Sequence, residues 1–309
     1  MTTSIAASAL TLQEKKRVFE ILPGVVPVPF YTPLRYPGGK GRLGPWLGEL
    51  MRYNRISGGW YVEPYAGGAG AAIYLLLEGY VDHIVINDVD PFVHAFWWAV
   101  LNDTEELLRL VAETPVNLGT WYLQKQVLAS PEAYSTTQVG FATFFLNRTN
   151  RSGILSGGVI GGQTQAGKYR LDARYNKREL AKRIRRIAAR RRHISLYCED
   201  AVQLIEGLQS DLPAKTLLYL DPPYYSKGSQ LYRNFYNSED HTKISKVVSQ
   251  LRHPWLVTYD DCDFIRGLYQ GFPSVTFSLY YSTHLSRPKA TEVMFYGNLI
   301  LHRAPTLRR

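Results

Sequence analysis

A buried strand with an abrupt ending is the feature that most limits the possible folds of this chain. The apolar run Leu217-Leu218-Tyr219-Leu220 has the length of a strand buried in a core. It stops at Asp221-Pro222-Pro223-Tyr224, because prolines lack the N–H group that a strand needs to continue. The sequence therefore predicts a carboxylate, a main-chain carbonyl and an aromatic ring at the tip of one strand.

These groups suit chemistry on an amino group attached to an aromatic ring. Such a nitrogen is a poor nucleophile, since its lone pair is delocalised into the ring. Asp221 could accept one N–H and the Pro222 carbonyl the other, which favours a pyramidal nitrogen. Tyr224 could stack on the aromatic ring that carries this amino group, a contact worth about 1–3 kcal/mol if the ring is a nucleic-acid base. The alternative is a buried strand that leaves the sheet through a proline turn, with the tyrosine filling the core.

A glycine-rich loop follows another short apolar stretch. Residues 60–62 read as a buried strand, Glu63-Pro64-Tyr65-Ala66-Gly67-Gly68-Ala69-Gly70 as a loop and residues 71–77 as a helix. This order is typical of the first unit of a nucleotide-binding α/β sheet, although the glycine spacing is not that of a strict dinucleotide fingerprint. Residues 83–88 read as the next strand, whose final Asp88 is positioned to accept hydrogen bonds from ribose hydroxyls.

A second pair of glycines precedes an amphipathic stretch. Arg35-Tyr36-Pro37-Gly38-Gly39-Lys40 leads into a predicted helix at residues 43–51. Adjacent glycines permit close approach of the backbone to a ligand, and a helix start favours an anion. A plain turn before a helix is the alternative. Residues 1–33, with a predicted helix at 12–21 and a proline-rich run at 22–30, are expected to form a surface lead-in.

The middle of the chain is basic and rich in loop residues. Residues 90–130 show helical spacing, residues 141–175 predict a long loop and residues 177–193 predict a helix with one apolar stripe and basic faces. These features favour contact with base edges and phosphates over a merely solvated surface. The candidate nucleic-acid residues are Asn147, Arg148, Arg151, Lys168, Arg170, Arg185, Arg186, Arg190 and Arg191.

The composition limits which classes of molecule the protein is expected to bind. The formal net charge of +10 and the pI near 9.4 favour a polyanion such as nucleic acid. The two cysteines and seven histidines show no spacing typical of a metal site, so no metal is predicted. No apolar run reaches the length of a membrane span, and the start lacks the pattern of a secretory signal. A cytoplasmic protein, bacterial or encoded by a phage, is expected.

With these motifs in place, the chain resembles the Dam-like class of DNA adenine N6-methyltransferases, in which the cofactor motifs precede the target-recognition segment and the catalytic motif comes last. The resemblance covers roughly residues 34–297. Its elements, in order along the chain, are Arg35-Tyr-Pro-Gly-Gly-Lys40, Val62-Glu-Pro-Tyr-Ala-Gly-Gly-Ala-Gly70, Ile86-Asn-Asp88, Phe145-Leu-Asn-Arg148 and Asp221-Pro-Pro-Tyr224.

The resemblance implies an α/β fold, a Rossmann-like sheet that uses S-adenosylmethionine and carries an inserted, mainly helical and loop-rich target-recognition region. It places the catalytic domain in residues 1–95 and 195–309 and the insertion in residues 96–194. It assigns catalysis to Asp221, Pro222 and Tyr224. The residues that it assigns to the cofactor are Tyr36, Gly38, Lys40, Glu63, Pro64, Tyr65, Gly67, Asp88, Asp200 and Asp221.

The expected partner is double-stranded DNA, with a cognate restriction system left open and a monomer or weak dimer as the assembly. Residues 157–175 differ from the segment expected of an enzyme that recognises the DNA sequence GATC, so the recognition sequence stays undetermined. Two alternatives remain at this stage. One is methylation of RNA adenine or of the cytosine amino group, and the other is a DNA-binding regulator or accessory subunit with a vestigial pocket.

Overall fold

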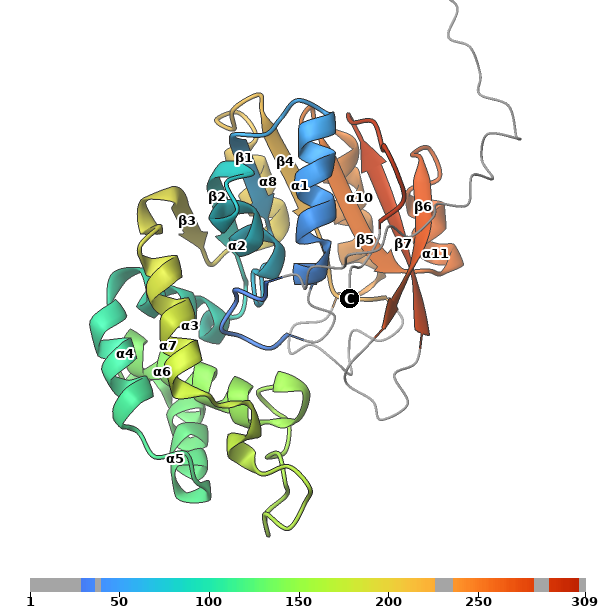
Figure 1. Cartoon of the computed structure of the whole chain (residues 1–309). Helices are drawn as coiled ribbons and strands as arrows, with labels where there is room; N and C mark the ends of the chain where they lie inside the picture. Colours follow the sequence, from blue (N-terminus) through green and yellow to red (C-terminus); the bar gives the residue numbers. More distant parts are fainter. Residues whose placement is uncertain (1–28, 37–39, 226–235, 281–288, 306–309) are drawn as a thin grey trace, which may run out of the picture.

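The computed structural model describes residues 29–36, 40–225, 236–280 and 289–305. The lead-in helix and the proline-rich run predicted at residues 12–30 therefore lie almost entirely outside the described residues, as does Gly38. The described chain forms a seven-stranded sheet with helices on both faces (Figure 1). The predicted α/β class is confirmed.

The sheet has the order β3-β2-β1-β4-β5-β7-β6. Strands β3, β2, β1, β4 and β5 are parallel, and β7 runs antiparallel to both β5 and β6. The bounds are β1 Gly59–Glu63, β2 Val81–Asn87, β3 Ile194–Tyr197, β4 Thr216–Leu220, β5 Trp255–Asp260, β6 Ser274–Tyr280 and β7 Lys289–Gly297.

Alternate residues of the strands feed two cores, as the two-residue period of a strand requires. Tyr61 and Leu217 face the helices at the front of Figure 1, whereas their neighbours Val62 and Leu218 face those behind. The front layer contains α1 Gly44–Tyr53, which follows the 3₁₀ helix η2 Lys40–Leu43, and α2 Gly70–Leu77. The rear layer contains α8 Ala201–Leu208, α10 Ser238–Ser249 and α11 Asp263–Leu268.

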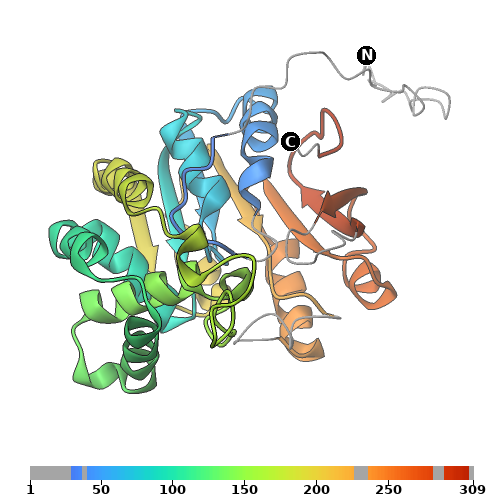
Figure 2. The same ribbon diagram turned by 60° about the horizontal axis from the view of Figure 1, so that its bottom comes forward.

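A helical region extends the front layer beyond β3 (Figures 1 and 2). It consists of α3 Pro91–Asn102, α4 Thr104–Glu113, α5 Leu118–Ala129, α6 Thr136–Thr149 and α7 Lys177–Ala188, with short 3₁₀ turns at Pro131–Ala133, Arg151–Gly153, Leu171–Arg174 and Arg191–His193. Helix α3 spans the predicted boundary at residues 95 and 96, so the helical region begins a few residues earlier than expected.

The apolar stripe predicted in residues 177–193 forms the buried face of helix α7. Leu180, Ile184 and Ile187 are buried at the i, i+4 and i+7 positions of one face. Asn176 caps the helix by accepting a hydrogen bond from the N–H of Glu179. The predicted one-sided amphipathic helix is confirmed, although it ends at Ala188 and a separate 3₁₀ turn carries the last arginines.

Candidate active site

The strand that carries the acid and prolines lies at the centre of the sheet. All five residues of β4 are buried between β1 and β5. The chain leaves β1 toward β2 and β3 on one side and returns through β4 on the other. Parallel α/β sheets bind ligands at the carboxyl ends of the strands where the order reverses in this way. Asp221, directly after β4, therefore lies at that position, at the lower edge of the sheet in Figure 1.

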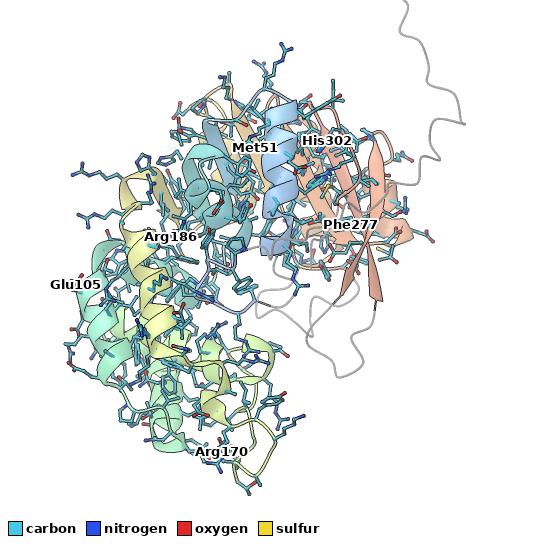
Figure 3. The ribbon with its side chains drawn as sticks, in the orientation of Figure 1. Met51, Glu105, Arg170, Arg186, Phe277 and His302 are labelled. Carbon is cyan, nitrogen blue, oxygen red and sulfur yellow. The ribbon has the colours of Figure 1, made fainter. Side chains whose placement is uncertain are left out.

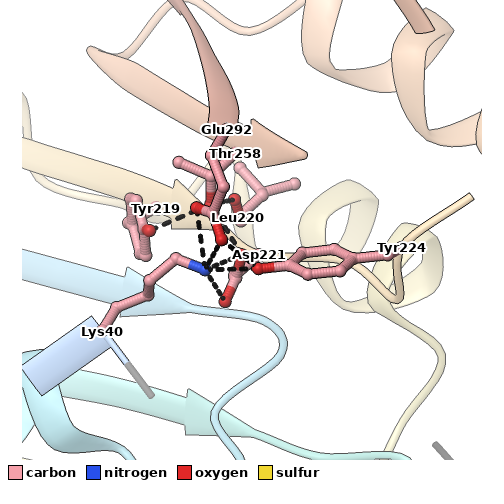
Figure 4. A network of polar contacts seen from close by, with 7 residues as sticks. All are labelled: Lys40, Tyr219, Leu220, Asp221, Tyr224, Thr258 and Glu292. Carbon is pink, nitrogen blue, oxygen red and sulfur yellow. Dashed lines mark hydrogen bonds and ion pairs between the residues drawn. The ribbon is translucent and has the colours of Figure 1, made fainter. Parts of the chain in front are cut away.

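Lys40 reaches Asp221 from the start of η2. Its Nζ lies 2.9 Å from each carboxylate oxygen of Asp221 and 3.1 Å from the Tyr224 hydroxyl (Figure 4). It also lies 3.2 Å from Oε2 of Glu292 on β7. The Lys40 side chain is almost fully buried. The structure thus brings Lys40, predicted for the cofactor, directly onto the predicted catalytic motif.

Asp221 has a second set of donors. The Thr258 hydroxyl on β5 donates to Oδ1 at 2.6 Å, and the Tyr219 hydroxyl lies 3.0 Å from Oγ1 of Thr258. A carboxylate offers about four lone-pair positions. Lys40 and Thr258 occupy three of them, so one position on Oδ2 is left by the described residues for a further N–H. The Asp221 side chain is 17% exposed, which leaves it accessible at the edge of the site.

Pro222 and Tyr224 are both buried. No described residue donates a hydrogen bond to the Pro222 carbonyl, which fits its predicted use as an acceptor. The Tyr224 hydroxyl donates to Oε1 of Glu292 and its ring is 3% exposed. The predicted stacking of Tyr224 on a base therefore requires a rearrangement around the ring.

The glycine loop is shaped by contacts that leave no room for side chains. Gly67 has a φ of +46°, and a Cβ there would lie 2.6 Å from the Tyr36 ring. Its N–H donates to Oδ2 of Asp88 at 2.8 Å, and its carbonyl accepts from the Trp97 indole at 2.9 Å. Tyr36, Gly67 and Asp88 are thus brought together, as predicted for a cofactor pocket.

Two carboxyl groups beside this loop are perturbed by burial. Burial raises the pKa of Glu63 to about 8, and its Oε2 accepts a hydrogen bond from the N–H of Ala72 at 3.2 Å. Burial also raises the pKa of Asp88 to about 7, against the opposing effect of its hydrogen bonds from Asp90 and Gly67. Perturbed carboxyl groups at the carboxyl ends of parallel strands are typical of a ligand site.

The remaining predicted cofactor residues line the same edge. The Pro64 carbonyl accepts from the Asn87 amide at 2.9 Å. The Tyr65 hydroxyl lies 2.9 Å from that of Tyr236. Asp200 follows β3 and caps α8, since its Oδ1 accepts from the N–H groups of Val202 and Gln203. Asp200 therefore has a local structural role besides any contact with a ligand.

Asn147 does not occupy a loop. The helical pattern of α6 continues through it, and its side chain is 3% exposed. Its amide accepts from the Arg35 N–H and donates to the carbonyls of Arg35 and Gly153, at 2.7, 2.6 and 2.9 Å. The structure does not present Asn147 to nucleic acid, because its hydrogen-bonding groups tie α6 to the segment that leads to Lys40.

Arg148 lies in a cluster of arginines at the seam between the helical region and the sheet. Its guanidinium donates to the carbonyls of Arg174 and Pro33. Arg35 donates to the Asn150 carbonyl at 3.0 Å and Arg183 to the Thr32 carbonyl at 3.2 Å. Burial, together with Arg35, Arg183 and Arg174, lowers the pKa of Arg148 to about 9.

None of the four members of this seam cluster, Arg35, Arg148, Arg174 and Arg183, lies within ion-pair distance of a carboxylate among the described residues. Cations that share a partly buried site repel one another unless an anion offsets them. The seam is therefore suited to bind an anion such as a phosphate.

The other basic candidates are spread widely. Arg151, Lys168 and Arg170 are exposed, and Figure 3 shows Arg170 at the far tip of the helical region. Arg185 and Arg186 are exposed on α7, where the Arg186 guanidinium lies 4.3 Å from the centre of the Tyr31 ring.

Arg190 and Arg191 lie apart from the catalytic motif. They precede β3, which is parallel to β2 and, through it, to β1 and β4. The residues before a parallel strand lie at the opposite edge of the sheet from those that follow one. The structure therefore separates Arg190 and Arg191 from Asp221 by the length of the sheet.

Glu292 and Thr258 are site residues that the sequence did not reveal. Both come from strands, and only the pairing of β5 with β7 and β4 places them beside Asp221. A charged residue directly before the apolar run Val293-Met294-Phe295 was the one signal for Glu292.

The described part of the chain offers neither a metal site nor a membrane span. No group of His, Cys, Asp or Glu there could hold a metal ion. No described helix combines the length and apolar character needed to cross a membrane.

Comparisons with known proteins agree on the chemistry. A family model of D12 class N6 adenine-specific DNA methyltransferases matches residues 36–286. The chain is similar to type II methyltransferase M.MjaIII of Methanocaldococcus jannaschii, at 23% identity over 77% of this chain and 88% of that protein. It is similar to type II methyltransferase M.CviBI of Paramecium bursaria Chlorella virus NC1A, at 23% identity over 69% of this chain and 77% of that protein.

Among solved structures, PH1948 from Pyrococcus horikoshii covers 86% of this chain and 87% of its own, with a TM-score of 0.40 and 10% identity, a likeness too distant to carry an inference. The family match spans the cofactor loop, the helical region and the catalytic motif. The chain belongs to the D12 class of N6 adenine-specific DNA methyltransferases and methylates adenines at specific sites in DNA.

Proposed function

We propose that the chain transfers the methyl group of S-adenosylmethionine to N6 of an adenine turned out of duplex DNA, and that Asp221 and Pro222 hold the amino group. The observation that carries this proposal is the position of Asp221 at the strand tip, where the described residues leave one acceptor position on Oδ2. The alternatives of an RNA or cytosine substrate, or of a vestigial pocket, have no observation in their favour.

The residues of the glycine loop fit the cofactor. The backbone has a positive φ at Gly67 and at Ala69. Gly70 packs closely against Gly41, because a Cβ added to Gly70 would lie 3.0 Å from the Cα of Gly41. Tyr36, Glu63, Pro64, Tyr65, Gly67 and Asp88 would hold S-adenosylmethionine there, with Asp200 at the next strand end. Bound in this loop, the cofactor supplies a methyl group on a positively charged sulfur.

The chain's own residues contribute position and electrostatics. Asp221 and Pro222 accept the two N–H groups of the adenine, so that the nitrogen lone pair points away from the ring plane. Turning the base out of the stack costs a few kcal/mol, which stacking on Tyr224 and contacts of the pocket offset. Lys40 holds both oxygens of Asp221 and thereby fixes the plane of the carboxylate.

For DNA, we propose that phosphates bind along the seam cluster and the exposed loop that carries Arg151, Lys168 and Arg170. The division into a catalytic domain and an inserted recognition region, from about residue 91 to 194, remains part of this proposal.

Both relatives are named type II methyltransferases, so a cognate restriction enzyme is the proposed functional partner, in the cytoplasm of a bacterium or an infected cell. We propose a monomer or weak dimer as the assembly.

The test is Asp221→Ala. The variant is expected to lose methyl transfer by at least about 10³-fold, because the amino group loses its charged acceptor, while DNA affinity stays nearly unchanged. Transfer is measured with unmethylated plasmid DNA and labelled S-adenosylmethionine, and affinity by fluorescence anisotropy. Asp261→Ala, which removes an exposed carboxylate paired with Arg266, is the control. Normal turnover of Asp221→Ala would refute the proposed mechanism.

A further inference from the structure

Glu292 is a buried carboxylate inside the site that no part of the proposed mechanism uses. It lies on β7, opposite Asp260 of β5 and Phe277 of β6, and is 1% exposed. Its Oε1 accepts from the Tyr224 hydroxyl and lies 3.4 Å from Lys40 Nζ, and its Oε2 lies 3.2 Å from the same nitrogen. Oε1 accepts both hydrogen bonds, and Oε2 contacts the ammonium at ion-pair distance, a position that favours the ionised form of the carboxylate.

Lys40 thus stands between two carboxylates (Figure 4). Its ammonium contacts Asp221 at 2.9 Å and Glu292 at 3.2 Å, and each of these side chains is at least 80% buried. The other polar groups of the network, from Tyr219, Tyr224 and Thr258, are neutral hydroxyls. Among the described residues, this buried network therefore holds two carboxylates and one ammonium.

This count matters for the charge that develops during methyl transfer. The amino nitrogen forms the new bond to the methyl carbon with its lone pair, the electron pair of the carbon–sulfur bond stays on sulfur, and one N6 proton is then lost to water. Positive charge therefore passes through the nitrogen that Asp221 holds. A carboxylate neutralised by its own ammonium partner would stabilise that charge less than one that keeps its negative charge.

We propose that Glu292 is a positioning residue for methyl transfer: it shares the ammonium of Lys40, so that Asp221 keeps the negative charge that the reacting amino group needs. Glu292 also accepts the hydrogen bond from the Tyr224 hydroxyl, which links the tyrosine to the two charged groups. This inference rests on the proposed function of Asp221.

Glu292→Gln tests the charge while keeping the size of the side chain. The single-turnover rate of methyl transfer to unmethylated plasmid DNA is expected to fall about tenfold or more, with DNA affinity, affinity for S-adenosylhomocysteine and Tm close to wild type. Glu292→Asp, which keeps the charge, is expected to retain more of the rate. Glu49→Gln is the matched control, since Glu49 is a half-buried carboxylate paired with Arg303 and remote from the site.

A double variant isolates the role of Lys40. If Glu292 acts by sharing the Lys40 ammonium, then in a Lys40→Met background the added Glu292→Gln change leaves the rate unchanged or raises it, because the ammonium that the two carboxylates share is already gone. An equal loss of rate in both backgrounds would overturn the proposal. So would an unchanged rate in Glu292→Gln, or losses of rate, DNA affinity and Tm that are the same in the Gln and Asp variants.

Failure of this inference is distinguishable from failure of the proposed function. If Asp221→Ala abolishes transfer and Glu292→Gln does not impair it, only the role of Glu292 is lost. If Asp221→Ala turns over normally, the proposed function fails and the Glu292 proposal falls with it.

Discussion

Two partly buried cations show opposite surroundings. Lys40 lies between the carboxylates of Asp221 and Glu292, whereas Arg148 lies among three other arginines and donates only to main-chain carbonyls. In the first cluster the cation contacts two carboxylates and holds them in place. The second forms no ion pair with a described carboxylate, so it is suited to a partner that brings an anion. The difference separates the proposed site of chemistry from the proposed site of DNA binding.

The largest effect is expected from Lys40→Met. The change removes the ammonium that two buried carboxylates share, so the free energy of unfolding at pH 7 is expected to fall by about 3–5 kcal/mol. Denaturation in urea measures it. Arg266→Met, which breaks an exposed ion pair with Asp261, is the control and is expected to cost about 1 kcal/mol or less. If Lys40→Met lowers the free energy of unfolding no more than the control does, then Lys40 does not stabilise the buried carboxylates, and the two clusters do not differ in the way described.

A smaller effect on stability is expected from Arg148→Met. The carbonyls of Arg174 and Pro33 lose a donor, but repulsion among the remaining arginines falls, so the unfolding free energy is expected to change by about 1 kcal/mol or less. DNA affinity should fall, and the slope of log K against log salt should decrease by about 0.9 if one phosphate contact is lost. Anisotropy titrations at several salt concentrations measure the slope.

Arg109→Met is the control for that titration. Arg109 is ion-paired with Glu106 and Glu113 on exposed α4, so its loss is expected to leave the salt slope unchanged. Equal slopes for the wild type and Arg148→Met would place the phosphates elsewhere on the protein.

The smallest effect is expected from Arg190→Gln combined with Arg191→Gln. These residues precede β3, at the edge of the sheet away from Asp221, so DNA affinity is expected to change by less than about twofold. Lys168→Gln with Arg170→Gln removes the same charge from the exposed loop and is the matched comparison. A larger loss from the Arg190 and Arg191 pair than from this comparison would mean that DNA wraps around the sheet.

Much of the fold was predictable because strand ends and helix stripes are local. The run that ends at Asp221, the loop at Gly67 and the stripe of α7 each carry their own pattern within about ten residues. The contacts among site residues were not predictable in the same way. Lys40 and Asp221 are 181 residues apart, and Lys40 and Glu292 are 252 apart. No local pattern states which side chains meet across a sheet.

At Asn147 the local sequence pattern was misleading. Its polar neighbours, together with the glycines that follow, resemble the start of a loop, yet α6 is buried on nearly all sides and continues to Thr149. A polar residue in the last helical turn is then free to cross-link neighbouring segments. Its buried amide binds Arg35 instead of reaching solvent.

The position of β7 has a consequence for how the enzyme is made. This strand is the last of the described chain, yet it inserts between β5 and β6 and carries Glu292 to Lys40, which is synthesised near the beginning. A chain still emerging from the ribosome can fold its early strands while it lacks the second carboxylate. Methylation competence should therefore appear only after β7 has been synthesised and has inserted between β5 and β6.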